Sequence, residues 1–262
     1  MTRLGVLLFI FSASLALSSL ATAKQVIKLW SYYEFPPFVI SVAEKKGLTY
    51  DFVEMLNLFE GTGEYQFEVE ILPRKRLNSY LSSAKKGAVL WVNPLFFGDL
   101  KRKRYLWTNT ILEDEQAFIS RVQTPFLYTG PESLMKPNFV LGGMRGHVYG
   151  GIQKQIDEGK IIRSDVDKEK QNIGMLLKRR VNTFLIPRSA MRFYEQQLNL
   201  SGKIYYSPKP LISFTRSILV KHDMEVFDFL SGIVDNFKTD DYWQALLDQY
   251  GLSLPTGKKT DF

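Results

Sequence analysis

The stretch VIKLWSYYEFPPF, residues 26–38, decides the fold class together with the segments that follow it. Apolar residues alternate loosely over Val26 to Tyr32, which predicts a strand, and two prolines, Pro36 and Pro37, must end its hydrogen-bond ladder. Apolar residues then recur at helical spacing over residues 52–59, and a second alternating segment covers residues 67–71. Strand, helix and strand in this order predict an α/β unit.

The same kinds of element return further along the chain. Predicted strands cover residues 88–92, 116–122, 139–141, 181–186 and 215–220, and predicted helices begin at residues 142–146 (GGMRG), around residue 173 and at residues 226 and 241. The strand at 215–220 is expected to return to the first unit. Three consecutive acids, Glu113, Asp114 and Glu115, are expected to form a solvated turn before the strand at 116–122. The chain is therefore predicted to be an α/β protein with two units.

The first 23 residues have the composition of a secretory signal peptide. Arg3 precedes an apolar stretch from Leu4 to Leu17, and small residues ending in Ala21-Thr22-Ala23 follow, so cleavage is expected before Lys24. A membrane anchor is the alternative, but a spanning helix needs roughly 20 apolar residues and this stretch is shorter. The mature chain is expected to be soluble and located in the periplasm.

Composition excludes several classes of function. The formal net charge is +7, and removing Met1 to Ala23 lowers it to +6 because Arg3 is lost. The cations are scattered along an exported chain, so they indicate solubility and a preference for anionic ligands rather than a nucleic-acid partner. The chain has no cysteine, only His147 and His222 as histidines, and no phosphate-binding loop, so neither a metal nor a cofactor is predicted.

Six short motifs share their order and spacing with a known family. They are residues 33–38 (YEFPPF), 47–56 (GLTYDFVEML), 102–108 (RKRYLWT), 143–146 (GMRG), 178–184 (KRRVNTF) and 237–251 (FKTDDYWQALLDQYG). Through them the whole mature chain resembles the bacterial extracellular solute-binding proteins of family 3, the type that serves polar amino-acid transporters.

The resemblance implies a type 2 periplasmic binding fold, in which two α/β lobes are joined by two crossing strands, here residues 116–122 and 215–220. Lobe 1 would comprise residues 24–120 and 212–262, and lobe 2 residues 121–211. The protein would be a monomer that closes on a small solute and delivers it to the membrane permease of an ABC transporter. A membrane receptor is the alternative partner, and a dehydratase-like enzyme on the same fold is the alternative activity.

The resemblance also suggests ligand-binding residues in lobe 1. An aromatic residue that covers the ligand falls on Phe35, with Tyr33 and Phe38 as its neighbours. The carboxylate-binding arginine of the family is replaced by Lys101, and Arg102 lies one position away; lysine would lose the bidentate geometry of arginine.

Small polar residues that accompany that arginine are also replaced. Pro94 and Phe96 stand in their places and make this wall more apolar, while Asn93 can still donate and accept hydrogen bonds.

In lobe 2 the family holds a carboxylate with backbone N–H groups at the start of a helix. The aligned residues here are Met144, Arg145, Gly146 and His147, followed by Val148, and the hydroxyls of the family are missing.

The acid that pairs with an α-amino group in the family is replaced by Pro187, and Arg188 follows it. A buried ammonium would therefore lack a counter-charge at this position. We expect an anionic or aromatic solute rather than an ordinary α-amino acid. An enzyme would need an acid or base in the cleft, and the residues that the sequence offers are Glu34 and His147.

Overall fold

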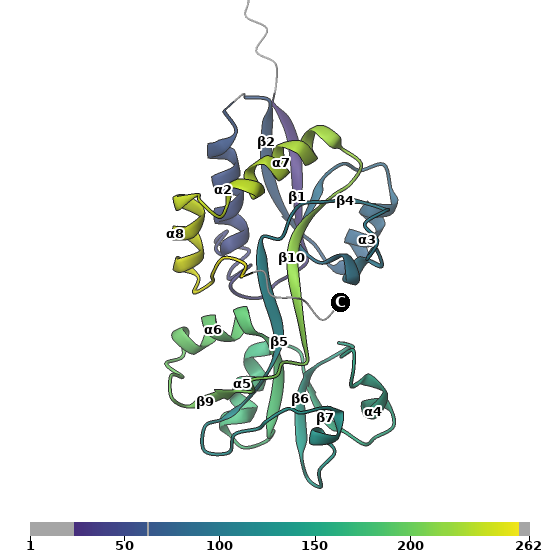
Figure 1. Ribbon diagram of the computed structural model, residues 1–262, viewed down its shortest axis with the longest axis vertical. Helices are drawn as coiled ribbons and strands as arrows, with labels where there is room; N and C mark the ends of the chain where they lie inside the picture. Colours follow the sequence, from purple (N-terminus) through teal and green to yellow (C-terminus); the bar gives the residue numbers. More distant parts are fainter. Residues whose placement is uncertain (1–23, 62, 257–262) are drawn as a thin grey trace, which may run out of the picture.

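A continuous sheet runs through the whole structure (Figure 1). The computed structural model describes residues 24–61 and 63–256, and the predicted signal peptide lies outside them. Within these residues the sheet has ten strands in the order β2-β1-β3-β10-β5-β8-β6-β7, with β4 paired to β10 and β9 paired to β5. In the same part of the chain, no helix combines the length and the apolar composition that a membrane span requires.

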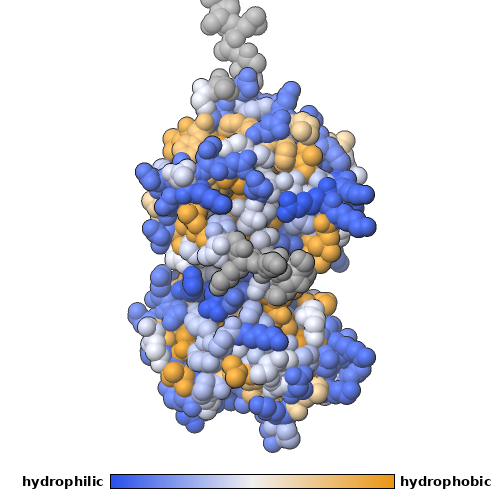
Figure 2. Space-filling model, viewed as in Figure 1, coloured by the Kyte–Doolittle hydropathy of each residue, from blue (hydrophilic) through white to orange (hydrophobic). Residues whose placement is uncertain are grey.

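The elements gather into two groups above and below the middle of the sheet (Figure 1). Lobe 1 contains β1 (Gln25–Ser31), α2 (Leu48–Phe59), β2 (Tyr65–Ile71), α3 (Arg74–Ser82), β3 (Ala88–Val92), η1 (Pro94–Phe97), β4 (Leu106–Trp107), α7 (Met224–Asn236) and α8 (Asp241–Gln249). Lobe 2 contains η2 (Pro131–Leu134), β6 (Val140–Met144), α4 (Gln153–Asp157), β7 (Ile162–Val166), α5 (Glu169–Leu177), β8 (Thr183–Pro187), α6 (Arg188–Gln197) and β9 (Ile204–Tyr206). Figure 2 shows a narrow waist between the two lobes.

Two long strands, β5 (Leu112–Arg121) and β10 (Ile212–Val220), pass between the lobes (Figure 1). They pair antiparallel, with Ile212 opposite Gln116 and Arg216 opposite Leu112. The predicted crossing strands are confirmed in position, although both begin earlier than the sequence indicated. Because each strand runs through both groups without a break, the lobe boundaries at residues 120/121 and 211/212 stay a prediction.

Each lobe has its own hydrophobic core. In lobe 1, α2, α7 and α8 pack aromatic side chains under β3, and the rings of Phe237 and Trp243 stack with centroids 4.4 Å apart. In lobe 2, α5 and α6 cover β8, where Phe184 is fully buried. The helix predicted to begin at residue 226 is confirmed as α7, and its Val226, Leu230 and Val234 face the core.

The three consecutive acids do not form the solvated turn that was expected. They lie inside β5, which begins at Leu112 rather than at Gln116. The side chain of Asp114 is 2% exposed and pairs with Arg216 of β10. The prediction was wrong because three acids in a row show no alternation of apolar and polar residues, which is the usual signal of a strand. The structure nevertheless buries one of them, Asp114, by pairing it with Arg216.

The glycine-rich segment 142–146 does not open a helix. Strand β6 continues to Met144, and the next helix, α4, begins only at Gln153. A Cβ atom on Gly142 would lie 2.6 Å from the side-chain oxygen of Asn172 and 2.8 Å from Cβ of Phe184. Glycine is thus required here by close packing within a buried strand, and not by a helix start.

Candidate functional site

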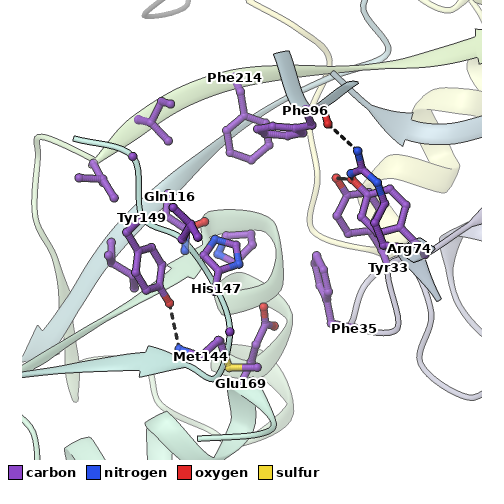
Figure 3. Close-up of a pocket in the computed structure, with 18 of the residues that line it drawn as sticks. Tyr33, Phe35, Arg74, Phe96, Gln116, Met144, His147, Tyr149, Glu169 and Phe214 are labelled. Carbon is purple, nitrogen blue, oxygen red and sulfur yellow. Dashed lines mark hydrogen bonds between the residues drawn. The ribbon is translucent and has the colours of Figure 1, made fainter. Parts of the chain in front are cut away.

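A cleft of about 670 Å³ lies between the two lobes, and both lobes and the crossing strands contribute to its walls (Figure 3). Lobe 1 supplies the loop after β1, the start of α3 and η1, whereas lobe 2 supplies residues 144–150 and the start of α5. The lining residues are Tyr32, Tyr33, Phe35, Arg74, Leu95, Phe96, Gln116, Met144, Arg145, Gly146, His147, Val148, Tyr149, Gly150, Glu169, Leu185, Pro187, Leu211, Ile212, Phe214 and Arg216.

Aromatic rings form most of the lobe 1 wall. Tyr33 and Phe35 lie in the loop after β1, which ends at Ser31, and their rings meet edge to face with centroids 5.2 Å apart. Phe96 of η1 packs against Phe214 of β10 at 5.4 Å (Figure 3). These rings give the cleft flat apolar surfaces against which a ring or an aliphatic chain can pack.

Arg74, the first residue of α3, is the cation on the lobe 1 wall. Its Nη2 donates to the carbonyl oxygen of Phe96 at 2.5 Å, and its Nη1 donates to the hydroxyl of Tyr32 at 3.3 Å. Its Nε donates to Oδ1 of Asn78 at 2.9 Å. These partners are neutral, so they orient the guanidinium without cancelling its positive charge.

Arg216 lies deeper, at the base of the cleft. Its Nε and Nη2 donate to Oδ2 of Asp114 at 3.1 and 2.7 Å, and its Nη1 donates to the carbonyl of Trp91 at 3.0 Å. The guanidinium also lies over the ring of Tyr33, 4.9 Å from its centroid. Burial is the largest single effect and disfavours the charged form, but the carboxylate of Asp114 together with Tyr33 and Tyr32 outweighs it, so the pKa of Arg216 is raised.

A bulge in β3 directs the Trp91 carbonyl toward Arg216. The pairing of β10 with β3 shifts register between Ser217 and Leu219, which places an extra residue on β3. Trp91 has a φ of 64°, a conformation that is costly for a bulky residue. Its side chain is held by a hydrogen bond from Nε1 to Oγ1 of Thr49 at 2.9 Å.

The lobe 2 wall is a loop between β6 and α4. Its N–H groups are largely used within the protein: Met144 donates to the Tyr149 hydroxyl at 3.0 Å, Arg145 to the Val166 carbonyl at 2.9 Å, and His147 to the Met144 carbonyl at 3.0 Å. The expected cradle of free N–H groups at a helix start is therefore absent at these three residues. The side chain of Arg145 is paired with Asp167 at 2.7 Å.

His147 faces the cleft beside Tyr149, with ring centroids 4.6 Å apart (Figure 3). Burial and the nearby charge of Arg163 lower the pKa of His147 from its ordinary value, so its imidazole is neutral at neutral pH. Burial raises the pKa of Tyr149 to about 12, so its hydroxyl keeps its proton.

Glu169, the first residue of α5, directs its carboxyl into the cleft close to Met144 and His147 (Figure 3). Its Oε2 atom is buried and has no hydrogen-bond partner within the described residues. Burial, and then the negative charge of Asp114, raise the pKa of Glu169 to about 8, although Arg216 acts in the opposite direction. The group is mainly neutral at pH 7.

Comparisons with known proteins bear on the fold. No family model and no curated protein matches the chain. Solved structures do match: the P235GK mutant of ArgBP from T. maritima is 14% identical, with a TM-score of 0.63 over 86% of this chain and 95% of that chain. The GluR0 ligand-binding core from Nostoc punctiforme, in complex with (L)-glutamate, is 14% identical with a TM-score of 0.64, over 86% and 98%.

A third similar structure is the ancestral amino acid-binding protein AncCDT-1, a precursor of cyclohexadienyl dehydratase. It is 12% identical, with a TM-score of 0.63 over 86% of this chain and 95% of that chain. The chain has the type 2 periplasmic binding fold. This confirms the fold class predicted from the sequence, and the fold is the one that the resemblance to family 3 implied.

Within this periplasmic binding fold, many of the residues predicted to bind ligand line the cleft. They are Tyr33, Phe35, Phe96, Met144, Arg145, Gly146 and His147. Their contact with a ligand stays a prediction. Pro187 also lines the cleft, which agrees with the alignment that put it at the position of the family's acid.

The structure places other predicted residues away from the cleft walls. Phe38 is fully buried in the core of lobe 1, behind Phe35. Asn93 is buried and already engaged, because its Nδ2 donates to the Thr215 carbonyl at 2.9 Å and its Oδ1 accepts from the N–H of Leu95 at 2.9 Å. Asn93 therefore joins η1 to β10 and has little capacity left for a ligand.

Lys101 and Arg102 lie on an exposed loop and not on the cleft wall. This loop folds around Asp99, whose carboxylate accepts hydrogen bonds from the N–H groups of Lys103 and Arg104 and from Nε1 of Trp107 at 2.8 Å. Lys101 and Arg102 therefore do not take the place of the family arginine in the cleft. The cations that reach the cleft are Arg74 from lobe 1 and Arg216 from the crossing strand β10.

Arg188 also lies outside the cleft lining. It forms an ion pair with Glu115 and covers the ring of Tyr206, with 4.7 Å to the centroid. Glu34, one of the groups considered for catalysis, is exposed and does not line the cleft either.

Sequence reasoning missed Arg74, Glu169, Tyr149, Phe214 and Arg216. One of them had a signal: an arginine within the otherwise apolar segment 215–220 is unusual for a buried strand and calls for a paired acid. Glu169 had no local signal, because an acid in the first turn of a helix is common.

Proposed function

We propose that the chain is a periplasmic solute-binding protein that closes on a small solute and delivers it to an ABC transporter without chemical change. The observation that carries this proposal is the cleft itself, whose walls come from two lobes connected by β5 and β10. Such a site is complete only when the lobes approach each other, so a solute that contacts both lobes favours the closed form.

The exposure of the cleft rim supports such closure. Val148 lines the cleft on lobe 2 and is 69% exposed, which is unusual for an apolar residue in a fixed wall. An approach of lobe 1 with a solute between the lobes would cover this side chain and contribute apolar burial to the closed form.

The side chains support a solute with an apolar or aromatic body. Phe35, Phe96 and Phe214 offer ring faces and edges, and Arg74 offers a positive charge that its protein partners leave uncompensated. An acidic group near Arg74 would agree with the expected preference for an anionic or aromatic solute. The protein is proposed to act as a monomer whose closed form docks on a permease.

Identification of a co-purified solute tests this function. The mature protein is purified, denatured, and analysed by mass spectrometry for released small molecules, which are then added back to the protein emptied by unfolding and refolding. The proposal predicts that a released molecule rebinds unchanged with a stoichiometry of one. Turnover of that molecule, or a single rigid body in solution scattering with and without it, would contradict the proposal.

A second function, that of an enzyme on the same fold, has one observation in its favour. Glu169 presents a largely neutral carboxyl to the cleft at pH 7, which is the state that a general acid requires. The test is incubation of the protein with the recovered solute and chromatography of the mixture. Product that forms with the native chain and not with Glu169→Gln would favour the enzyme over the binding protein.

A further inference from the structure

Building on the proposed binding function, we propose that Glu169 is the recognition group for an ammonium group of the solute, and that its carboxyl releases a proton when this ammonium binds. The cleft would thus take a primary amine carried on an apolar or aromatic body. The sequence alignment, in contrast, left an ammonium without a counter-charge because Pro187 replaces the family's acid.

The position of Glu169 carries the first step of the argument. It begins α5 on lobe 2, lines the cleft next to His147, and has a buried Oε2 with no hydrogen-bond partner in the described chain. A buried oxygen of this kind is costly to leave unpaired. A solute that donates an N–H to this carboxyl would remove this cost, and Figure 3 shows the carboxyl directed toward the space between His147 and Phe35.

The charges around the cleft favour an ammonium over a neutral donor. Three arginines close to the cleft already have acidic partners: Arg216 pairs with Asp114, Arg145 with Asp167, and Arg163 with Asp165, each at 2.7 Å. Arg74, whose partners are neutral, lies on the opposite wall in lobe 1. Glu169 is the one acid among the described residues that line the cleft, and no ion pair involving it is found there. Among the described residues, Glu169 is therefore the acid of the cleft lining at which an ammonium can form an ion pair without displacing a cation of the protein.

Aromatic rings in the same cleft suit such a solute. Phe35 of lobe 1 and His147 of lobe 2 both line the cleft, and Figure 3 shows their rings beside the Glu169 carboxyl. Ring faces attract organic cations, and they also pack against the hydrocarbon part of an amine. One solute molecule can therefore be held by a carboxyl from lobe 2 and by rings from both lobes.

The proton balance follows from the groups that face Glu169. Asp114 of β5 and Arg216 of β10 act on it from the crossing strands, and Tyr149 and Tyr194 face it from the loop and from α6. Both tyrosines have pKa values raised to about 12 and stay neutral, as does His147, whose pKa is lowered.

With burial raising the pKa of Glu169 to about 8, the carboxyl of the empty cleft is mainly protonated at pH 7. A bound ammonium favours the carboxylate, so the O–H bond of the carboxyl breaks, the proton passes to the buffer, and an ammonium–carboxylate pair forms. Amine binding is therefore coupled to proton release.

Titration calorimetry with phenethylamine and 3-phenylpropionate tests the inference. The two probes share an aromatic body and differ in the sign of their charge. At pH 7, phenethylamine is expected to bind the native chain and to release close to one proton, measured from the binding enthalpies in phosphate and in Tris buffer. Glu169→Gln is expected to weaken phenethylamine binding roughly 10- to 100-fold and to abolish the dependence on buffer.

Two controls accompany this test. Glu158→Gln makes the same side-chain substitution at an exposed position of lobe 2 and is expected to leave phenethylamine binding unchanged. Should Glu169→Gln fold poorly, a carbon NMR signal of the Glu169 carboxyl in the native chain at pH 7 is expected to move to the ionised position when phenethylamine is added.

The inference is overturned if the native chain does not bind phenethylamine, or if Glu169→Gln binds it with native affinity and buffer dependence. A co-purified solute that carries only acidic groups would also overturn it, while leaving the binding function intact. A different result would contradict the proposed binding function itself: no solute would close the two lobes.

Discussion

Arg216 and Asp114 face each other across the two crossing strands, with 2.7 Å between Nη2 and Oδ2 and with both side chains 2% exposed. In the antiparallel pairing Asp114 lies opposite Phe214, so the ion pair is a diagonal contact between β5 and β10. Ser189 of α6 adds a hydrogen bond from its hydroxyl to Asp114 at 2.7 Å. The pair thus connects both crossing strands to lobe 2 at the point where the lobes meet.

Loss of the Asp114 charge should destabilise the protein strongly. Asp114→Asn leaves the buried Arg216 without its counter-charge, and the free energy of unfolding is expected to fall by about 3–5 kcal/mol. Urea denaturation followed by circular dichroism measures this change.

The matched control is Glu68→Gln, which breaks an ion pair with Lys28 whose side chains are 47% and 45% exposed. Its expected effect is below about 1 kcal/mol because solvent screens exposed pairs. If Asp114→Asn costs no more than this control, the ion pair does not hold the crossing strands together.

The raised pKa of Glu169 should make stability depend on pH. The folded empty protein keeps the Glu169 proton up to about pH 8, whereas the unfolded chain releases it near the ordinary value of 4.5. Between these pH values the folded state binds more protons at Glu169 than the unfolded state does. The contribution of Glu169 to the free energy of unfolding therefore falls as the pH rises through this window, and it levels off above it. Melting temperatures from pH 5 to pH 9 test this, because Glu169→Gln should gain stability relative to the native chain as the pH rises. Parallel curves for the two proteins would show that Glu169 is not perturbed.

Removal of the Phe35 ring should affect binding more than folding. Phe35 is partly exposed and lies in the cleft, so Phe35→Ala is expected to weaken binding of the recovered solute about tenfold or more, with a smaller effect on the melting temperature. Tyr242→Ala serves as the control, since Tyr242 is an aromatic residue of lobe 1 that is 46% exposed and does not line the cleft. Equal solute affinities for the two variants would remove Phe35 from the site.

A methyl group on Gly142 should destabilise lobe 2. The added Cβ would lie 2.6 Å from Asn172 Oδ1 and 2.8 Å from Cβ of Phe184, so Gly142→Ala is expected to cost about 1–3 kcal/mol of unfolding free energy. Gly174→Ala, in α5, has open space at the Cβ position and should stabilise the protein by up to about 1 kcal/mol. Thermal unfolding of both variants measures these changes. A Gly142→Ala variant as stable as the native chain would contradict the close packing at Gly142.

Periodicity predicted the elements whose burial follows a regular pattern, such as the half-buried β2 and the amphipathic α7. It failed at residues 142–146, because glycines that pack closely in a strand look the same in sequence as glycines at a helix start. The resemblance to family 3 failed for Lys101, since a basic run near the position of the family arginine says nothing of Asp99, which folds that loop away from the cleft. Glu169 was missed because the charges that act on it, Asp114 of β5 and Arg216 of β10, are distant in the sequence.

The most direct test of lobe closure is an electron–electron distance across the cleft. The chain contains no cysteine, so Lys75→Cys on α3 and Lys154→Cys on α4 give two unique sites for spin labels on exposed helices of opposite lobes. A second pair within lobe 2, Lys154→Cys with Lys178→Cys, reports any change that is not closure. On addition of a mixture of amino acids, short amines and short carboxylates, the distance between the lobes is predicted to shorten while the distance within lobe 2 stays constant. An interlobe distance that no solute in the mixture changes would contradict the account.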